Sequence, residues 1–287
     1  MKIRTTTAIV GVLAILVSAL TLRAEVIYSE SFDYGTTSGV DLETVSNWDT
    51  PSTGDPRYSS SGLDVAGMSN ETGGRMINGG DNSRSRDTDY DFTIGNTPSA
   101  AVPMSDLAVG DSLWLAAIFD YKIDGYGEGV TGVNYGFSLQ VKGGYSTMGA
   151  AIDPSGDVFV ATTNTSTSQD TGISVVTGTY LMLFKYTKGA ADGSGSSVDL
   201  WIDPANTSSE GSLGTADYTN NSITWGSDSD SLTQVLADLT VNGSGFDEIR
   251  LATELSEAIT NVTIPEPSTL ILALLGLTGM LVRRRRK

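Results

Sequence analysis

The sequence predicts an all-β protein built as an antiparallel two-sheet sandwich. Three observations lead to this prediction. Short runs of apolar or alternating residues recur along most of the chain. Segments rich in Gly, Ser, Thr, Asn and Asp separate these runs. Glycine is also frequent, at 33 of the 287 residues, which is typical of a chain with many turns.

The strand-like runs differ in how clearly they indicate their surroundings. In the run 112–123 both alternating sets of side chains are largely apolar, so we expect a strand covered on both faces or one that lines a groove. The clearest runs are 26–28, 63–65, 90–94, 112–123, 133–141, 148–152, 157–161, 180–186, 197–202, 222–225 and 246–252.

Two local patterns predict more specific structure. The sequence Asp153-Pro154-Ser155-Gly156 has proline at the second position and glycine at the fourth, as in a type I turn, and it predicts a hairpin over 148–161. Only one segment, 231–239, has apolar residues at helical spacing, and it is the one helix expected in the middle of the chain.

Composition excludes several classes of function. The sequence contains no cysteine and no histidine, so disulfides, thiolate metal sites and Ser-His or Cys-His catalytic pairs are absent. Of the 17 basic residues, three precede Glu25 and five follow Val282, which leaves nine between them against all 34 acidic residues. A segment with this negative charge repels nucleic acid and is soluble, so no nucleic-acid partner is expected.

The first 24 residues have the order of a secretory signal peptide. Lys2 and Arg4 precede an apolar run over 8–20, and the sequence becomes polar after Ala24. Cleavage after Ala24 fits this order, and cleavage after Ala19 is an alternative. An uncleaved anchor helix is a further alternative, although the apolar run is short for a membrane span. The general secretory machinery is therefore an expected partner.

Residues 264–287 combine a proline-rich break, an apolar segment and a basic end. The apolar stretch 268–282 is about 22 Å long as a helix, shorter than the ~30 Å hydrocarbon core, but snorkelling arginines and local thinning compensate for such a gap. The five basic residues 283–287 should stay cytoplasmic, which places residues 25–263 on the outer side of the membrane. We therefore expect a single transmembrane helix in this tail.

This tail resembles the PEP-CTERM sorting signal of Gram-negative bacteria. The resemblance is carried by Pro265-Glu266-Pro267, the apolar segment and the cluster of Arg283, Arg284, Arg285 and Arg286. It implies recognition by an exosortase, residence in the inner membrane during sorting, and a final place in the cell envelope, at the cell surface or in the extracellular matrix. The alternative is an ordinary stop-transfer helix that follows two prolines.

Residues 25–263 resemble the concanavalin-A-like, laminin-G-like jelly rolls that often precede such tails. The resemblance rests on four segments: 31–34, 180–186, 198–204 with its Asp203-Pro204 end, and the last strand 246–251. It implies a two-sheet jelly roll whose concave face binds glycans in some relatives, so an exopolysaccharide is an expected partner.

The sequence gives no catalytic residue. Glucanases of this fold carry Glu-x-Asp-x-x-Glu on one strand, and that motif is absent. The adjacent acids Asp247 and Glu248 are expected on opposite faces of a strand, with Glu248 and Arg250 towards solvent. The protein is therefore expected not to be an enzyme, with a glycan-binding module as the alternative and a polysaccharide-cleaving enzyme as the third reading.

Two sets of residues are candidate ligand sites. Asp87, Asp89 and Asp91 suit calcium if they lie in a loop, and otherwise they are solvated acids on a strand edge; Asp228 and Asp230 add two carboxylates. Aromatic residues in Gly- and Ser-rich segments suit sugar stacking, and core packing is the alternative. The candidate glycan-binding residues are Trp48, Tyr126, Tyr135 and Trp225.

Overall fold

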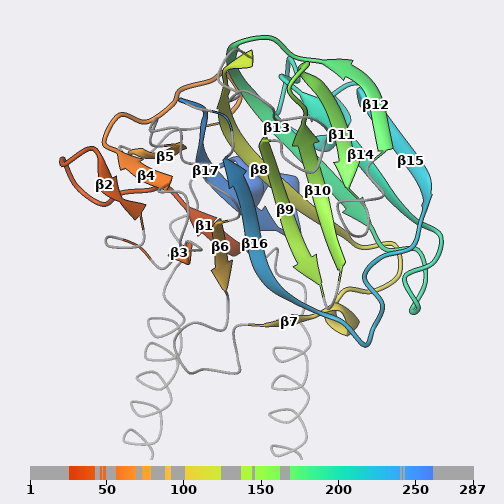
Figure 1. Cartoon of the computed structure of the whole chain (residues 1–287). Helices are drawn as coiled ribbons and strands as arrows, with labels where there is room; N and C mark the ends of the chain where they lie inside the picture. Colours follow the sequence, from red (N-terminus) through yellow and green to blue (C-terminus); the bar gives the residue numbers. More distant parts are fainter. Residues whose placement is uncertain are drawn as a thin grey trace, which may run out of the picture.

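The computed structural model describes residues 26–42, 46, 48–49, 56–68, 73–78, 88–91, 101–123, 137–143, 146–161, 169–239, 241 and 243–260. These residues form two antiparallel sheets with little helix, which confirms the predicted all-β class (Figure 1). The predicted signal peptide and the tail 264–287 lie outside them. Within the described part of the chain, no helix is both long and apolar enough to cross a membrane.

The first sheet, sheet A, contains nine strands. Its order is β15 (Tyr218–Ile223), β14 (Ser196–Ile202), β13 (Gly178–Thr187), β8 (Ser112–Tyr121), β17 (Gly245–Ala252), β5 (Arg75–Asn78), β4 (Pro56–Ser59) and β2 (Val40–Asp41), and β1 (Val26–Glu30) also pairs with β17. The central pair, β8 and β17, joins segments that are far apart in the sequence.

The second sheet, sheet B, contains eight strands. Its order is β12 (Gln169–Ser174), β11 (Asp157–Ala161), β10 (Ser146–Ile152), β9 (Phe137–Gly143), β16 (Ser231–Leu239), β6 (Thr88–Asp91) and β3 (Trp48–Asp49), and β7 (Val102–Pro103) pairs with β16. The predicted hairpin over 148–161 is confirmed by β10 and β11. Gly156 donates its N–H to the Asp153 carbonyl at 2.9 Å and has φ of +90°, a conformation that favours glycine.

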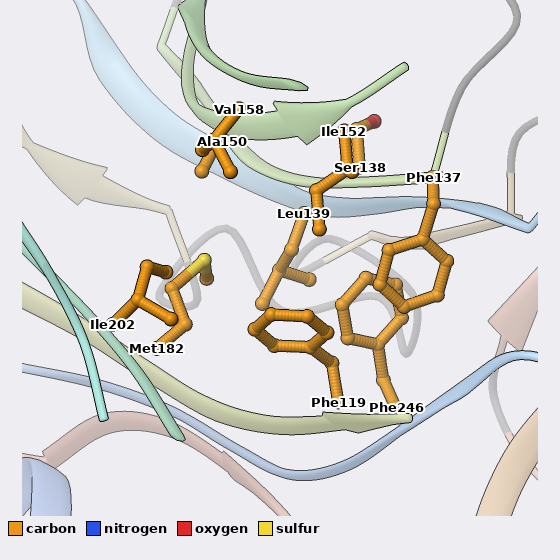
Figure 2. Close-up of a pocket in the computed structure, with 10 residues that line it drawn as sticks. All are labelled: Phe119, Phe137, Ser138, Leu139, Ala150, Ile152, Val158, Met182, Ile202 and Phe246. Carbon is orange, nitrogen blue, oxygen red and sulfur yellow. The ribbon is translucent and has the colours of Figure 1, made fainter. Parts of the chain in front are cut away.

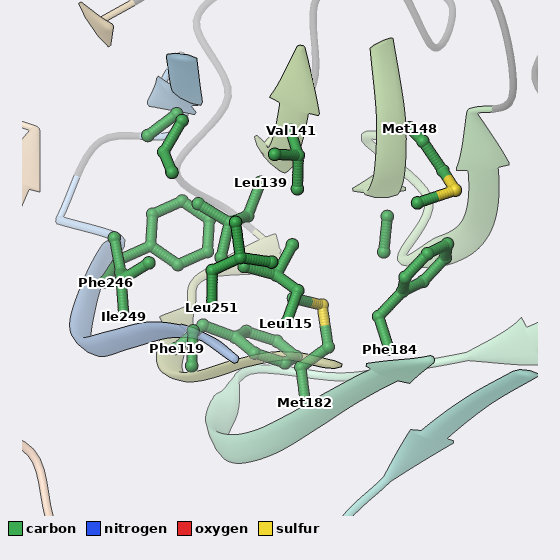
Figure 3. Packing of buried hydrophobic residues seen from close by; sticks show 14 of the residues in the cluster. Leu115, Phe119, Leu139, Val141, Met148, Met182, Phe184, Phe246, Ile249 and Leu251 are labelled. Atoms are coloured by element: carbon green, nitrogen blue, oxygen red, sulfur yellow. The ribbon is translucent and has the colours of Figure 1, made fainter. Parts of the chain in front are cut away.

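The main hydrophobic core lies between the two sheets. Strand β8 contributes Leu115 and Phe119, whose side chains face residues of sheet B such as Leu139 and Val141 (Figure 3). Phe137 of β9 stacks on Phe246 of β17 with ring centroids 4.2 Å apart. Burial of this apolar surface is the main stabilising contribution, since the chain has no cysteine to form disulfides.

A second apolar cluster covers the outer face of sheet A. Trp114 of β8 stacks on Trp201 of β14 with ring centroids 5.8 Å apart. Leu63 from a loop, and the short helix α3 (Leu255–Ile259), pack on the same cluster. Strand β8 is therefore buried on both faces, as its sequence predicts.

The helix expected over 231–239 is wrong, because this segment is strand β16. Val235, Ala237 and Leu239 are buried at alternate positions, as in a strand with one face on the core. A bulge between Leu232 and Gln234 shifts the register, so that Leu232 is also buried although it is three residues before Val235. Because of this bulge, apolar residues at helical spacing can both be buried in a strand.

We expect residues 25–263, expressed without either terminal segment, to be soluble, monomer-sized and rich in β-structure. The physical reason is that the described residues bury two apolar clusters and expose only Val109 and Val176 among their large hydrophobic side chains. Far-ultraviolet circular dichroism and size-exclusion chromatography check this, and a spectrum dominated by helix would contradict the fold.

Candidate functional site

The charged residues of the last strand are buried, so the predicted exposure of Glu248 and Arg250 to solvent is wrong. Asp247 and Glu248 are fully buried, and Arg250 is 3% exposed. Arg250 donates from Nη2 to Glu248 Oε2 and forms a buried ion pair with it. Strand β17 bulges against β8 between Asp247 and Arg250, and Glu248 has φ of +50°. The bulge breaks the simple alternation on which the prediction was based.

Asp247 connects sheet A to a distant loop. Its Oδ2 accepts the Leu63 N–H at 2.7 Å, and its Oδ1 accepts the Glu248 N–H at 2.8 Å. Burial raises the pKa of Asp247 to about 7, against the lowering effect of the Leu63 N–H. On the neighbouring strand β8, Asp120 pairs with Arg75 at 3.4 Å and with Lys122 at 2.7 Å. The hydrogen bond from Leu63 to Asp247 therefore holds the loop that contains Leu63 against sheet A.

The structure places two of the three candidate calcium ligands in a strand rather than a loop. Asp89 and Asp91 belong to β6, which pairs with β16 on one side and β3 on the other, so it is not an edge strand. Asp87 lies outside the described residues. The described part of the chain has no group of three or more acidic side chains placed to hold a metal ion. Calcium binding at these three residues stays a prediction.

Two of the candidate sugar-stacking residues lie in the core. Trp48 is 2% exposed and stacks on Phe32 at 6.1 Å, and Trp225 is 3% exposed and packs edge-on against Tyr186 at 5.0 Å. Their rings are covered by protein, so these two tryptophans pack in the core, which was the alternative to sugar stacking. Tyr126 and Tyr135 lie outside the described residues.

The outer side of sheet B carries a row of polar side chains that sequence reasoning missed, and those at its centre are buried: Ser138 is 8% exposed and Gln140 is 6% exposed. On β9, Phe137, Leu139 and Val141 face the core, so the alternate side chains face outward. The pairing register brings these next to outward residues of β16 and β10, which lie on either side of β9 (Figure 1). The outward residues are Ser138, Gln140 and Lys142 of β9, Gln234, Leu236 and Asp238 of β16, Thr147, Gly149 and Ala151 of β10, and Phe159 of β11. We call this set the sheet B face.

Hydrogen-bonding groups on the sheet B face are close together. Gln140 is 6% exposed and donates from Nε2 to Ser138 Oγ at 3.1 Å. Lys142 lies opposite both Gln234 and Thr147 in the register. Thr147 Oγ1 is buried and has no hydrogen-bond partner within the described residues. Gly149 of β10 packs closely against the backbone of β9, where an added Cβ would lie 2.2 Å from the Leu139 carbonyl oxygen.

The signal that could have revealed this face is the alternation of residues 137–141, which reads Phe, Ser, Leu, Gln, Val. An outward serine and glutamine in a central strand indicate a polar face rather than a second core. By contrast, a small cavity between the sheets is enclosed mainly by apolar side chains, including Phe119, Phe137 and Met182 (Figure 2). This cavity is part of the core and offers no constellation of polar side chains.

The comparison with known families decides the nature of the tail. Residues 263–287 match the PEP-CTERM protein-sorting motif. The chain carries a PEP-CTERM sorting signal. Pro265, Glu266, Pro267 and the arginines 283–286 all fall within the match, although they lie outside the residues that the structure describes. PEP-CTERM signals belong to exported proteins that are sorted to the envelope or surface of Gram-negative bacteria, so the predicted export and sorting are confirmed at this level.

No curated protein matches the chain in sequence. Among solved structures, it is similar to an endo-β-1,4-glucuronan lyase from the fungus Trichoderma reesei, at 10% identity and a TM-score of 0.43, covering 82% of this chain and 98% of that one. It is also similar to an alginate lyase from Aplysia kurodai, at 10% identity and a TM-score of 0.44, covering 80% and 100%. The Emp46p carbohydrate recognition domain aligns at 12% identity and a TM-score of 0.40, covering 80% and 98%.

Proposed function

We propose that this PEP-CTERM protein displays a non-catalytic β-sandwich that binds a glycan of the envelope or extracellular matrix through the sheet B face. The observation that carries the proposal is the row of amide, hydroxyl and amino groups on the outer side of β9, β10 and β16. On this proposal an exosortase processes the tail at the inner membrane, and the sandwich then stays in the envelope or matrix.

The chemistry of the sheet B face suits neutral sugars. Glutamine amides both donate and accept hydrogen bonds, as sugar hydroxyls do, and the half-buried Gln234 carries such a group beside the buried Gln140 of the adjacent strand. Phe159 of β11 lies opposite Ala151 of β10 at one side of the face, is half-buried, and has an apolar ring for stacking. Lys142 is the one cation among the ten residues of the face, and the chain as a whole has a net charge of −17. A strongly anionic polysaccharide would therefore be repelled overall.

Three features support a binding role rather than a catalytic one. The central positions of the sheet B face carry glutamines, and amides do not transfer protons at neutral pH as a paired acid and base must. The sequence also has no histidine to supply a general base. The Asp247 carboxyl, whose pKa is raised by burial, lies on sheet A beneath the Leu63 loop, away from this face.

A glycan array probed with the full chain, with and without calcium, tests the proposal. We expect binding to neutral polysaccharides in both conditions and no change in the chain length of the bound glycan. If incubation with a bound polysaccharide gave shortened products, the protein would be a polysaccharide-cleaving enzyme rather than a binding module. No binding to any glycan would overturn the proposed ligand class.

A further inference from the structure

Lys188 is the most deeply buried lysine in the described part of the chain, at 2% exposed. It follows strand β13 of sheet A. Its ammonium donates to the Met104 carbonyl at 2.6 Å and the Leu107 carbonyl at 2.8 Å, and it forms an ion pair with Asp228 Oδ1. An ammonium group has three protons, so each of them has an oxygen partner.

The three oxygens come from the segments next to β7 and β16 of sheet B. Met104 begins a short 3₁₀ helix (Met104–Asp106) directly after β7, and Asp228 lies just before β16. The Met104 N–H donates to the Asp230 carbonyl at 3.0 Å, which holds these two segments together. The main chain of Lys188 is also fixed, because its carbonyl accepts the Gly110 N–H at 2.8 Å. One positive charge therefore joins the end of sheet A to the β7–β16 end of sheet B.

Two carbonyls and one carboxylate around a single positive charge are the ligand set that hard metal ions use in proteins. We propose that this cage is a cation site of the fold, and that the ammonium of Lys188 occupies it in place of a metal ion. Asp228 is then a structural counter-ion. In the native protein it is satisfied by the lysine and does not recruit calcium, although the sequence marks Asp228 and Asp230 as candidate carboxylates for that ion.

The first experiment removes the resident cation from the full chain, purified in detergent from a host without an exosortase. We expect Lys188→Ala to lower the melting temperature by about 10 °C, because it leaves the carbonyls of the buried residues Met104 and Leu107 without their donor. The matched control is Lys185→Met. Lys185 pairs with the exposed Glu210 on the surface, so we expect a shift of roughly 2 °C or less. Equal shifts for the two variants would overturn the proposal.

The second experiment refills the site. We expect methylammonium chloride or calcium chloride at millimolar concentration to raise the melting temperature of Lys188→Ala by several degrees more than that of the parent. Choline, which has no N–H to donate and is too large for the cage, should give no extra shift. Adding Asp228→Asn to the variant should remove the rescue. Rescue by choline, or rescue that survives Asp228→Asn, would show that the cage is not the site.

If Lys188→Ala does not fold, Asp228→Asn decides alone, because it keeps the lysine and removes only its charged partner. We expect it to lower the melting temperature by about 3–6 °C, and the surface control Glu210→Gln to lower it by roughly 1 °C at most. A shift for Asp228→Asn no larger than that of Glu210→Gln would overturn the proposal.

Discussion

Replacing Pro265-Glu266-Pro267 with three alanines should leave the protein unprocessed in a host that carries an exosortase. The two prolines lack a backbone N–H and disfavour helix in the residues before them, so they should keep this strip extended and accessible to a processing enzyme. We expect the parent to lose the basic residues 283–287 through cleavage near 265–268, and the alanine variant to keep them. Intact-mass measurement and membrane fractionation distinguish the two forms.

The same parent chain in a host without an exosortase is the matched control for this experiment, and it should retain its full C-terminus. Replacing Arg283, Arg284, Arg285 and Arg286 with glutamine tests the other half of the motif. Without the positive charges that hold the cytoplasmic end, we expect processing of this variant to fall as well. Equal processing of the parent and the alanine variant would show that Pro265-Glu266-Pro267 is not a sorting signal and that the tail is only a membrane anchor.

The second large effect concerns the pH dependence of stability at Asp247. Burial raises the pKa of this carboxyl to about 7 in the folded protein, from about 3.9 in the unfolded chain. The folded state therefore holds the proton more tightly. The stability from the neutral carboxyl is fully present below about pH 4 and is lost as the pH rises to about 7. The shift of about three units corresponds to roughly 4 kcal/mol in the free energy of unfolding.

Denaturant unfolding of the parent and of Asp247→Asn, measured between pH 4 and pH 8, checks this value. We expect the parent to lose about 4 kcal/mol relative to the variant across that range. Asp192→Asn is the control, because hydrogen bonds from Ser194 lower the pKa of the exposed Asp192 carboxyl, so this group titrates below the measured range and the variant should follow the pH profile of the parent. Parallel pH profiles for the parent and Asp247→Asn would contradict the raised pKa.

Much of the fold follows from local sequence patterns. The double apolar alternation of 112–121 predicts a strand buried on both faces, and the Asp153–Gly156 turn predicts the β10–β11 hairpin; both are present. The failures occur where bulges interrupt alternation. At β16 a bulge after Leu232 imitates helical spacing, and at β17 a bulge at Glu248 changes the direction of its neighbours. Bulges depend on the partner strand, which a single sequence does not identify.

The candidate site was less predictable, because burial and pairing depend on distant segments. Trp48 and Trp225 lie in Gly- and Ser-rich stretches, yet both are core residues. The burial of Glu248 and Arg250 depends on tertiary structure. The apolar cluster on the outer face of sheet A includes Leu63, which is far from β17 in the sequence. The polar residues of the sheet B face come together only when β9 pairs with β16, about 100 residues later in the chain.

The most direct test of the proposed function is the affinity of the sheet B face for the glycan identified on the array. We would measure it by calorimetry for the parent, for Gln140→Ala combined with Gln234→Ala, and for Asn221→Ala, an exposed amide of β15 on sheet A. We expect the double variant to bind roughly 10- to 100-fold more weakly, because each lost hydrogen bond contributes about 0.5–1.5 kcal/mol, and Asn221→Ala to bind like the parent. Equal affinities for the parent and for a double variant that melts at the parent's temperature would contradict binding at this face.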